Sequence, residues 1–246
     1  DLLLSITSDN ISEGNASVIK KAKRKLLAEI ELSDSQTIQY EEVELNKSNC
    51  IKILDELDDK NKFDFHLFLF HQKYLLKFLT HGDLIFFEKY QVESIYKSID
   101  FVNFISPYFS ESYNSLLVKN IRQKNYANVE KILSVLPIVN EQYLDKCYNG
   151  TYVFLKNVEA DINTIIRDID AGRHPALNKN CEEISNIVTE KVSIVIVNKL
   201  PSYFQSIRNQ LAEAINNLST VVYNEPHSCI VPAFKLMEIA KTITTD

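Results

Sequence analysis

Glycine is scarce in this sequence, which contains only four glycines in 246 residues. Average usage near ~7% would give roughly seventeen. Folds built from strands need many tight turns with positive φ, which glycine adopts without a steric cost, whereas glycine weakens helices. The shortage therefore predicts an all-α fold.

Long apolar runs and closely spaced cysteines are also missing. The strongest apolar run, at residues 192–197, is far shorter than the ~18 residues that a membrane-spanning helix requires. The four cysteines lie far apart, which predicts neither a zinc knuckle nor a redox pair. We expect four reduced thiols in a cytoplasmic protein. Because the chain opens on Asp1 without a starting Met, we also expect it to be a segment of a longer protein.

The motifs of most familiar enzyme classes are absent as well. The sequence has no glycine-rich phosphate loop, no dinucleotide fingerprint and no G-x-S-x-G elbow. His66 and His71 are five residues apart, which places them on different sides of a helix, and no H-E-x-x-H pattern offers a metal site. We predict no metal and no cofactor, and most familiar enzyme classes are left without support. The net charge of −6 works against general binding of nucleic acid.

Three segments differ in their apolar patterns. Residues 1–82 predict a helical subdomain, with an amphipathic helix at 18–30, a strand or a loop at 37–45, and an aromatic-rich helix at 63–80 that ends at Gly82. Residues 83–137 predict short helix pairs, with breaks near Gln91, at Ser106-Pro107, at Asn125 and at Pro137.

The third segment, residues 138–246, predicts a long antiparallel helical hairpin or bundle. Apolar residues at 144–169 follow alternating steps of four and three, which indicates a helix packed lengthwise on a partner close in sequence. The chain then reverses at Gly172-Arg173-His174-Pro175, and the returning apolar face begins with Ile184, Val188, Val192 and Val195. Pro201 should kink this helix or start a new one, because proline lacks a backbone donor. The β-branched run at 192–197 is expected to be helical.

The N-terminal segment resembles the opening of J-domain co-chaperones. The residues that carry the resemblance are a short apolar piece at 2–6, a polar turn, and the basic helix Ile19-Lys-Lys-Ala-Lys-Arg-Lys-Leu-Leu27. The resemblance covers about the first eighty residues. J-domains carry His-Pro-Asp after the basic helix, but the corresponding stretch here is Glu31-Leu-Ser-Asp-Ser35. It therefore implies a degenerate J-like fold that has lost co-chaperone activity.

One pattern offers a catalytic alternative. Arg167 is followed by a polar residue and, seven positions after the arginine, by His174 at the predicted reversal. This is similar to the Arg-x(4 to 6)-His motif of HEPN ribonucleases. The resemblance implies that His174 acts as general acid or base on RNA while Arg167 stabilises the phosphate. Folding alone also accounts for both residues, as a cation near a helix C-terminus and a turn residue before Pro175.

A basic cluster offers the main binding candidate. It consists of Lys20, Lys21, Lys23, Arg24 and Lys25. No aromatic platform accompanies these cations, which favours an acidic protein surface over RNA as their partner. We therefore interpret the chain as a non-catalytic interaction or scaffold module. A HEPN-like ribonuclease and a co-chaperone-related J-like module are the alternatives.

Overall fold

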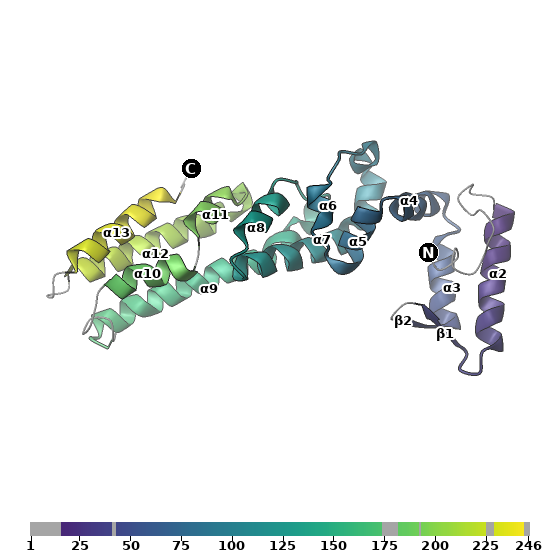
Figure 1. Ribbon diagram of the computed structural model, residues 1–246, viewed down its shortest axis with the longest axis horizontal. Helices are drawn as coiled ribbons and strands as arrows, with labels where there is room; N and C mark the ends of the chain where they lie inside the picture. The colour runs from purple at the N-terminus through teal and green to yellow at the C-terminus, as the bar shows by residue number, and fades with distance from the viewer. Residues whose placement is uncertain (1–15, 41–42, 174–181, 192, 225–228, 244–246) are drawn as a thin grey trace. The chain divides into compact units, whose positions relative to one another are not determined.

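Helices dominate the computed structural model, which describes residues 16–40, 43–173, 182–191, 193–224 and 229–243 (Figure 1). The strands within these ranges form one two-stranded sheet, so the all-α prediction is confirmed. The chain divides into two compact units, Asp1–Leu76 and Lys77–Asp246. None of the helices in the described ranges is both long and apolar enough to cross a lipid bilayer.

The first unit packs α2 (Ala16–Leu32) lengthwise against α3 (Lys47–Glu56), with α4 (Lys60–His71) completing the core. One face of α2 carries apolar residues at the spacing of an amphipathic helix, as predicted. The buried core residues of this unit are Ile19, Ala22, Leu26, Ile30, Leu45, Cys50, Leu54 and Phe63.

A β-hairpin connects α2 to α3. Strands β1 (Thr37–Tyr40) and β2 (Val43–Asn46) are antiparallel, with Ile38 opposite Leu45. The alternation at residues 37–45 is thus a strand pattern, one of the two readings that the sequence left open. The hairpin reverses the chain, and α3 returns antiparallel to α2: Glu31 near the end of α2 pairs with Lys47 at the start of α3.

Two helices occupy the aromatic-rich stretch for which the sequence predicted one. Helix α4 ends at His71, and α5 (Lys73–His81) follows. Gln72 ends the first helix because its ψ of 68° leaves the helical region, while its carbonyl accepts the Leu76 N–H to start the second. Gly82 stops α5 as predicted, with a φ of +66°.

Helix α7 (Ile99–Arg122) is the longest element of the first half of the second unit, and it runs through Pro107. The predicted break at Ser106-Pro107 is therefore wrong. The proline ring lies on the exposed side of the helix. The buried Ser106 hydroxyl donates to the Val102 carbonyl at 2.6 Å and accepts the Asn140 backbone N–H at 2.8 Å. These two bonds satisfy the buried hydroxyl of the residue before Pro107. Ser106 can therefore be buried without leaving an unpaired polar group.

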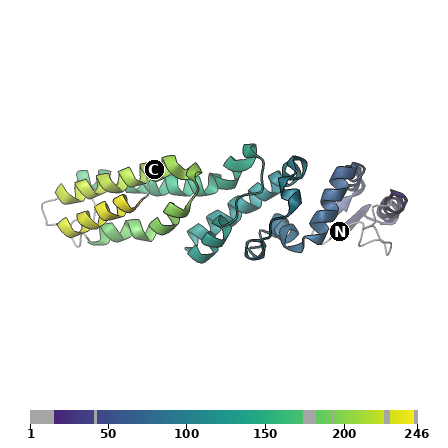
Figure 2. The same cartoon turned by 90° about the horizontal axis from the view of Figure 1, so that it is seen from above.

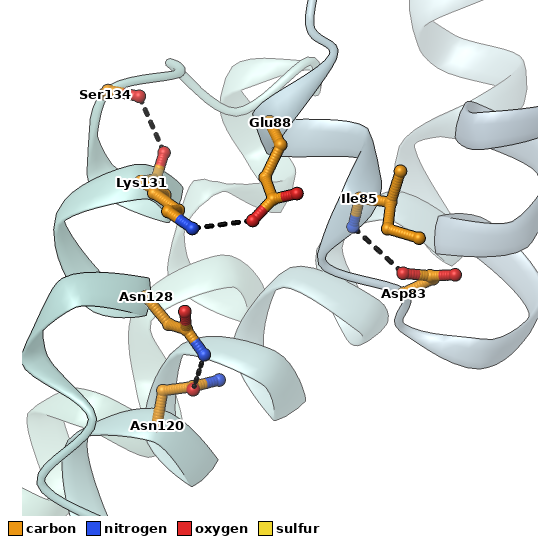
Figure 3. A network of polar contacts seen from close by, with 7 residues as sticks. All are labelled: Asp83, Ile85, Glu88, Asn120, Asn128, Lys131 and Ser134. Carbon is orange, nitrogen blue, oxygen red and sulfur yellow. Dashed lines mark hydrogen bonds and ion pairs between the residues drawn. The ribbon is translucent and has the colours of Figure 1, made fainter.

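Aromatic rings and polar bonds hold the short elements against α7. These elements are α6 (Ile85–Glu88), η2 (Ser94–Lys97) and α8 (Tyr126–Leu133). The Phe86 ring of α6 lies 6.1 Å from Phe109 of α7, and the Tyr96 ring of η2 lies 6.2 Å from Phe101 of α7. Figure 3 shows Lys131 of α8 donating to Glu88 of α6 at 2.6 Å. It also shows Asn128 of α8 donating to Asn120 of α7 at 3.0 Å.

The rest of the second unit is a helical bundle. Its elements are η3 (Glu141–Tyr143), α9 (Leu144–Asp170), α10 (Glu182–Lys191), α11 (Ile194–Lys199), η5 (Ser202–Phe204), α12 (Gln205–Asn224) and α13 (Ile230–Thr242). Helices α9, α10, α12 and α13 lie side by side in both views (Figures 1 and 2). Pro201 separates α11 from α12, as the sequence predicted, and residues 194–199 are helical rather than extended.

The main partner of α9 in the bundle is α12, which is far from it in sequence. The two helices run in the same direction, because Tyr148 near the start of α9 contacts Phe204 at 5.2 Å and Lys156, further along, bonds Gln210 at 3.0 Å. The predicted returning face is only partly right. Ile184 and Val188 are buried, but Val195 is exposed, and Val192 lies outside the described residues.

Helices α7 and α9 approach closely at Gly150. The Gly150 N–H donates to Asn114 Oδ1 at 2.7 Å, and a Cβ placed on this glycine would lie 2.7 Å from the same oxygen. Such a contact is far shorter than an ordinary carbon–oxygen contact. A side chain at position 150 would therefore displace the Asn114 side chain and break this hydrogen bond.

The cysteines do not all match the expectation of reduced thiols. Cys50 and Cys147 are free and buried, whereas Cys229 is part of a disulfide. The prediction is thus wrong for Cys229, because spacing along the chain cannot show which sulfur atoms the fold brings together.

Candidate functional site

A groove of about 590 Å³ runs between α2 and α3 in the first unit. Its floor is apolar and includes Ile19, Leu27 and Leu54. The α2 rim carries Lys20 and Arg24, and the α3 rim carries acidic residues. The groove thus joins an apolar floor to two rims of opposite charge.

The basic cluster divides into residues with different roles. Lys23 crosses the groove, where its amine donates to the Leu54 carbonyl at 2.6 Å and to Asp58 Oδ1 at 2.5 Å. Its side chain is only 14% exposed. Since the Leu54 carbonyl lies in the last turn of α3, at the negative end of the helix dipole, Lys23 stabilises that helix end. These contacts distinguish Lys23 from Lys20 and Arg24.

Lys20 and Arg24 are the cations that remain exposed at the groove. They lie one turn apart on α2, and neither makes a hydrogen bond or ion pair in the part of the chain that the structure describes. Lys21 and Lys25 are also exposed. They do not line the groove. The structure thus brings two of the five predicted binding residues to one rim.

Burial shifts the pKa of two titratable groups in this unit. Burial raises the pKa of the Cys50 thiol, so this cysteine is protonated at neutral pH. Burial also lowers the pKa of His66, against the opposing effect of Glu56, which lies 3.9 Å away. Across the described ranges, no group of three or more His, Cys, Asp or Glu side chains is placed to hold a metal ion.

The candidate catalytic pair is described only in part. Arg167 is exposed near the end of α9, where its guanidinium donates to the Asn163 carbonyl at 3.3 Å and to Thr164 Oγ1 at 2.9 Å. These are bonds to its own helix. His174 lies outside the described residues. The ribonuclease alternative stays a prediction, which metal-independent cleavage of RNA by the wild type but not by His174→Ala would establish.

Helix α9 ends just before Gly172, where the sequence predicted that the chain reverses. Gly172 has a φ of +65°, and the Arg173 N–H donates to the Asp168 carbonyl at 2.8 Å. This is the hydrogen bond of a Schellman motif, which ends many helices. The rest of the predicted reversal, from His174 onward, lies outside the described residues.

Two other grooves were not found from the sequence. One, of about 440 Å³, lies between the end of α5 and α7 and is lined by polar side chains that include Tyr108, Glu111 and Lys119. The other, of about 480 Å³, lies between α10 and α13 and is almost wholly apolar. Its signal in the sequence was the pair Ile230 and Val231 followed by Phe234, three apolar residues outside the buried stripe of α13.

Comparison with known proteins finds no match: no family model, no curated protein and no solved structure is significantly similar to this chain.

Proposed function

We propose that this protein is a non-catalytic interaction module that binds an amphipathic helix of a partner protein in the α2–α3 groove. The observation that carries the proposal is the combination of an apolar floor with two exposed cations one turn apart. Grooves of this kind recognise the apolar face of a helix through anchors at i, i+3 or i+4, and i+7. Ile51, which is 38% exposed, and the half-buried Leu27 and Leu57 supply the apolar contacts.

The charges on the rims specify the partner. Lys20 and Arg24 favour acidic residues one turn apart on the flank of the bound helix that faces α2. Asp55 on the other rim favours a neutral or basic residue on the opposite flank. Exposed ion pairs contribute only about 0.2–1 kcal/mol each, so the charges determine orientation and partner choice more than affinity.

A designed peptide tests this proposal. The probe is a fluorescein-labelled helix of about four turns with leucines at the anchor positions and two glutamates one turn apart on one flank. We expect it to bind the wild type, and Lys20→Glu/Arg24→Glu to weaken binding by roughly tenfold or more. The matched control, Lys21→Glu/Lys25→Glu, has the same net charge on the same helix outside the groove and should bind like the wild type.

Two outcomes would reject the proposal. Equal weakening by both double variants would mean that only the general charge of α2 matters. Binding of a labelled single-stranded RNA at this rim, with no binding of the peptide, would point to nucleic acid. The J-like alternative stays a prediction with its own test, stimulation of an Hsp70-type ATPase.

The cytoplasmic location also stays a prediction. The disulfide at Cys229 favours an oxidising compartment instead, because disulfides are rare in proteins of the reducing cytosol.

A further inference from the structure

Helix α13 exposes large apolar side chains at its N-terminal end. Ile230, Val231 and Phe234 are 55%, 59% and 59% exposed, and all three line the apolar groove between α13 and α10. Single exposed apolar residues are common on protein surfaces, but a contiguous apolar patch beside a groove marks an interaction site. The residues of this face indicate which kind of partner would cover it.

The order of residues on this face identifies that partner. Positions 231, 234, 235, 238, 239 and 242 share one face of the helix, because they follow the spacing of three and four residues. About a point between Leu236 and Met237, Phe234 is the mirror position of Ile239, and Lys235 is the mirror position of Glu238. The central apolar pair and the charged pair are thus self-complementary, while Val231, further out, is the mirror position of Thr242. This is the pattern that a twofold interface between identical helices requires, since each residue meets its mirror position on the other copy.

We propose that a second copy of this chain binds here, with the two α13 helices antiparallel about a twofold axis that passes between Leu236 and Met237. Phe234 of each copy enters the α10–α13 groove of the other, beside Ile239 of the partner subunit. Lys235 pairs with the partner subunit's Glu238, so the dimer contains two such ion pairs.

Within a single copy, Lys235 and Glu238 are available for this pairing. Lys235 makes no hydrogen bond or ion pair within the described ranges. Glu238 shares one contact of 3.4 Å with Lys241 on the same helix, and both side chains are about 60% exposed. Such an exposed contact contributes little, and its loss on dimerisation is small.

The size of the interface sets the expected affinity. Standard stable interfaces bury roughly 800 Å² on each partner, and a single helix face beside one groove provides less. We therefore expect a weak dimer that dissociates on dilution, at concentrations on the order of micromolar.

Sedimentation velocity over a range of concentrations tests the proposal with the purified chain alone. The mass of the wild type should rise from that of one chain to that of two as concentration increases. Phe234→Asp should stay a monomer, because a carboxylate in the apolar groove is unpaired. Val195→Asp is the matched control: Val195 is 62% exposed on α11, does not line the groove, and should dimerise like the wild type. A wild type that is monomeric at every concentration would overturn the proposal.

A charge exchange tests the register of the two helices. Lys235→Glu and Glu238→Lys should each weaken the dimer by roughly tenfold, because each places like charges opposite one another. The double variant Lys235→Glu/Glu238→Lys restores both pairs and the wild-type net charge, so it should recover the dimer. Two single variants that weaken the dimer without recovery in the double variant would disprove this arrangement. All these residues lie outside the α2–α3 groove, so the result is independent of peptide binding there.

Discussion

Replacing Gly150 by alanine tests the packing of α7 on α9. In an ordinary helix interior this change stabilises by about 0.5–1 kcal/mol, because alanine loses less backbone entropy on folding. Here the new Cβ would lie 2.7 Å from Asn114 Oδ1 and 3.2 Å from Asn114 Nδ2. The Asn114 side chain must move, which breaks its 2.7 Å hydrogen bond from the Gly150 N–H.

The expected magnitude follows from these opposing effects. Overpacking of a well-filled contact costs about 1–3 kcal/mol, and the lost hydrogen bond costs about 1 kcal/mol. After the helix-propensity gain, Gly150→Ala should lower the free energy of unfolding by about 1–3 kcal/mol. Urea denaturation followed by circular dichroism at the helical band measures this value.

A second substitution separates the contact from other causes. In an Asn114→Ala background the obstructing atoms are gone, so Gly150→Ala should become stabilising by about 0.5–1 kcal/mol. Gly82→Ala serves as the control. Its Cβ would meet nothing within 4 Å, but its φ of +66° makes alanine strained, and Asn114→Ala should not relieve that loss. A stabilising effect of Gly150→Ala in the wild-type background would refute the reasoning.

Four further predictions concern stability. Lys124 has a φ of +56° after the end of α7, so Lys124→Gly should raise the free energy of unfolding by about 1 kcal/mol, measured by urea denaturation. An unchanged free energy of unfolding would mean that the conformation is not strained. The buried Thr151 hydroxyl has no hydrogen-bond partner, so Thr151→Val should stabilise by about 1 kcal/mol in the same assay. Lys23→Met should destabilise by about 1–2 kcal/mol, whereas Lys20→Met should change little, since Lys23 bonds Leu54 and Asp58 while Lys20 makes no such bond within the described residues; equal effects would contradict the different roles of Lys23 and Lys20. Burial raises the pKa of Cys147 from 9.0 to about 12, so the unfolded chain loses this proton at lower pH than the folded one, and stability should fall as pH rises above 9; Cys147→Ala should make this pH dependence shallower between about pH 9 and pH 12.

The fold class and the positions of the buried residues within helices could be predicted from the sequence, because they depend on composition and spacing. The scarcity of glycine predicted helices, and the four-and-three steps of α9 predicted its buried face. Pro107 was misjudged, because whether a proline ends a helix depends on which side faces solvent and on the packing of the residues around it. The partner of α9 was also misjudged, since contacts between distant segments leave no mark in local spacing.

The candidate site shows the same limit. The sequence identified all five cations of α2, but five cations within six residues look alike until α3 is placed beside them. Only then does Lys23 become a structural residue, while Lys20 and Arg24 remain at a groove. The self-complementary face of α13 was equally present in the sequence. Its role in binding could be inferred only after the fold showed that Val231 and Phe234 are exposed.

Exchange of charge between the α2–α3 groove and its ligand tests the central claim most directly. The measurement is the fluorescence anisotropy of the glutamate peptide, and of the same peptide with lysines in place of its two glutamates, titrated with the wild type and with Lys20→Glu/Arg24→Glu. We predict that the wild type prefers the glutamate peptide and that the variant prefers the lysine peptide, because each rim then meets opposite charge. Binding of neither peptide, or the same preference in both proteins, would contradict the account.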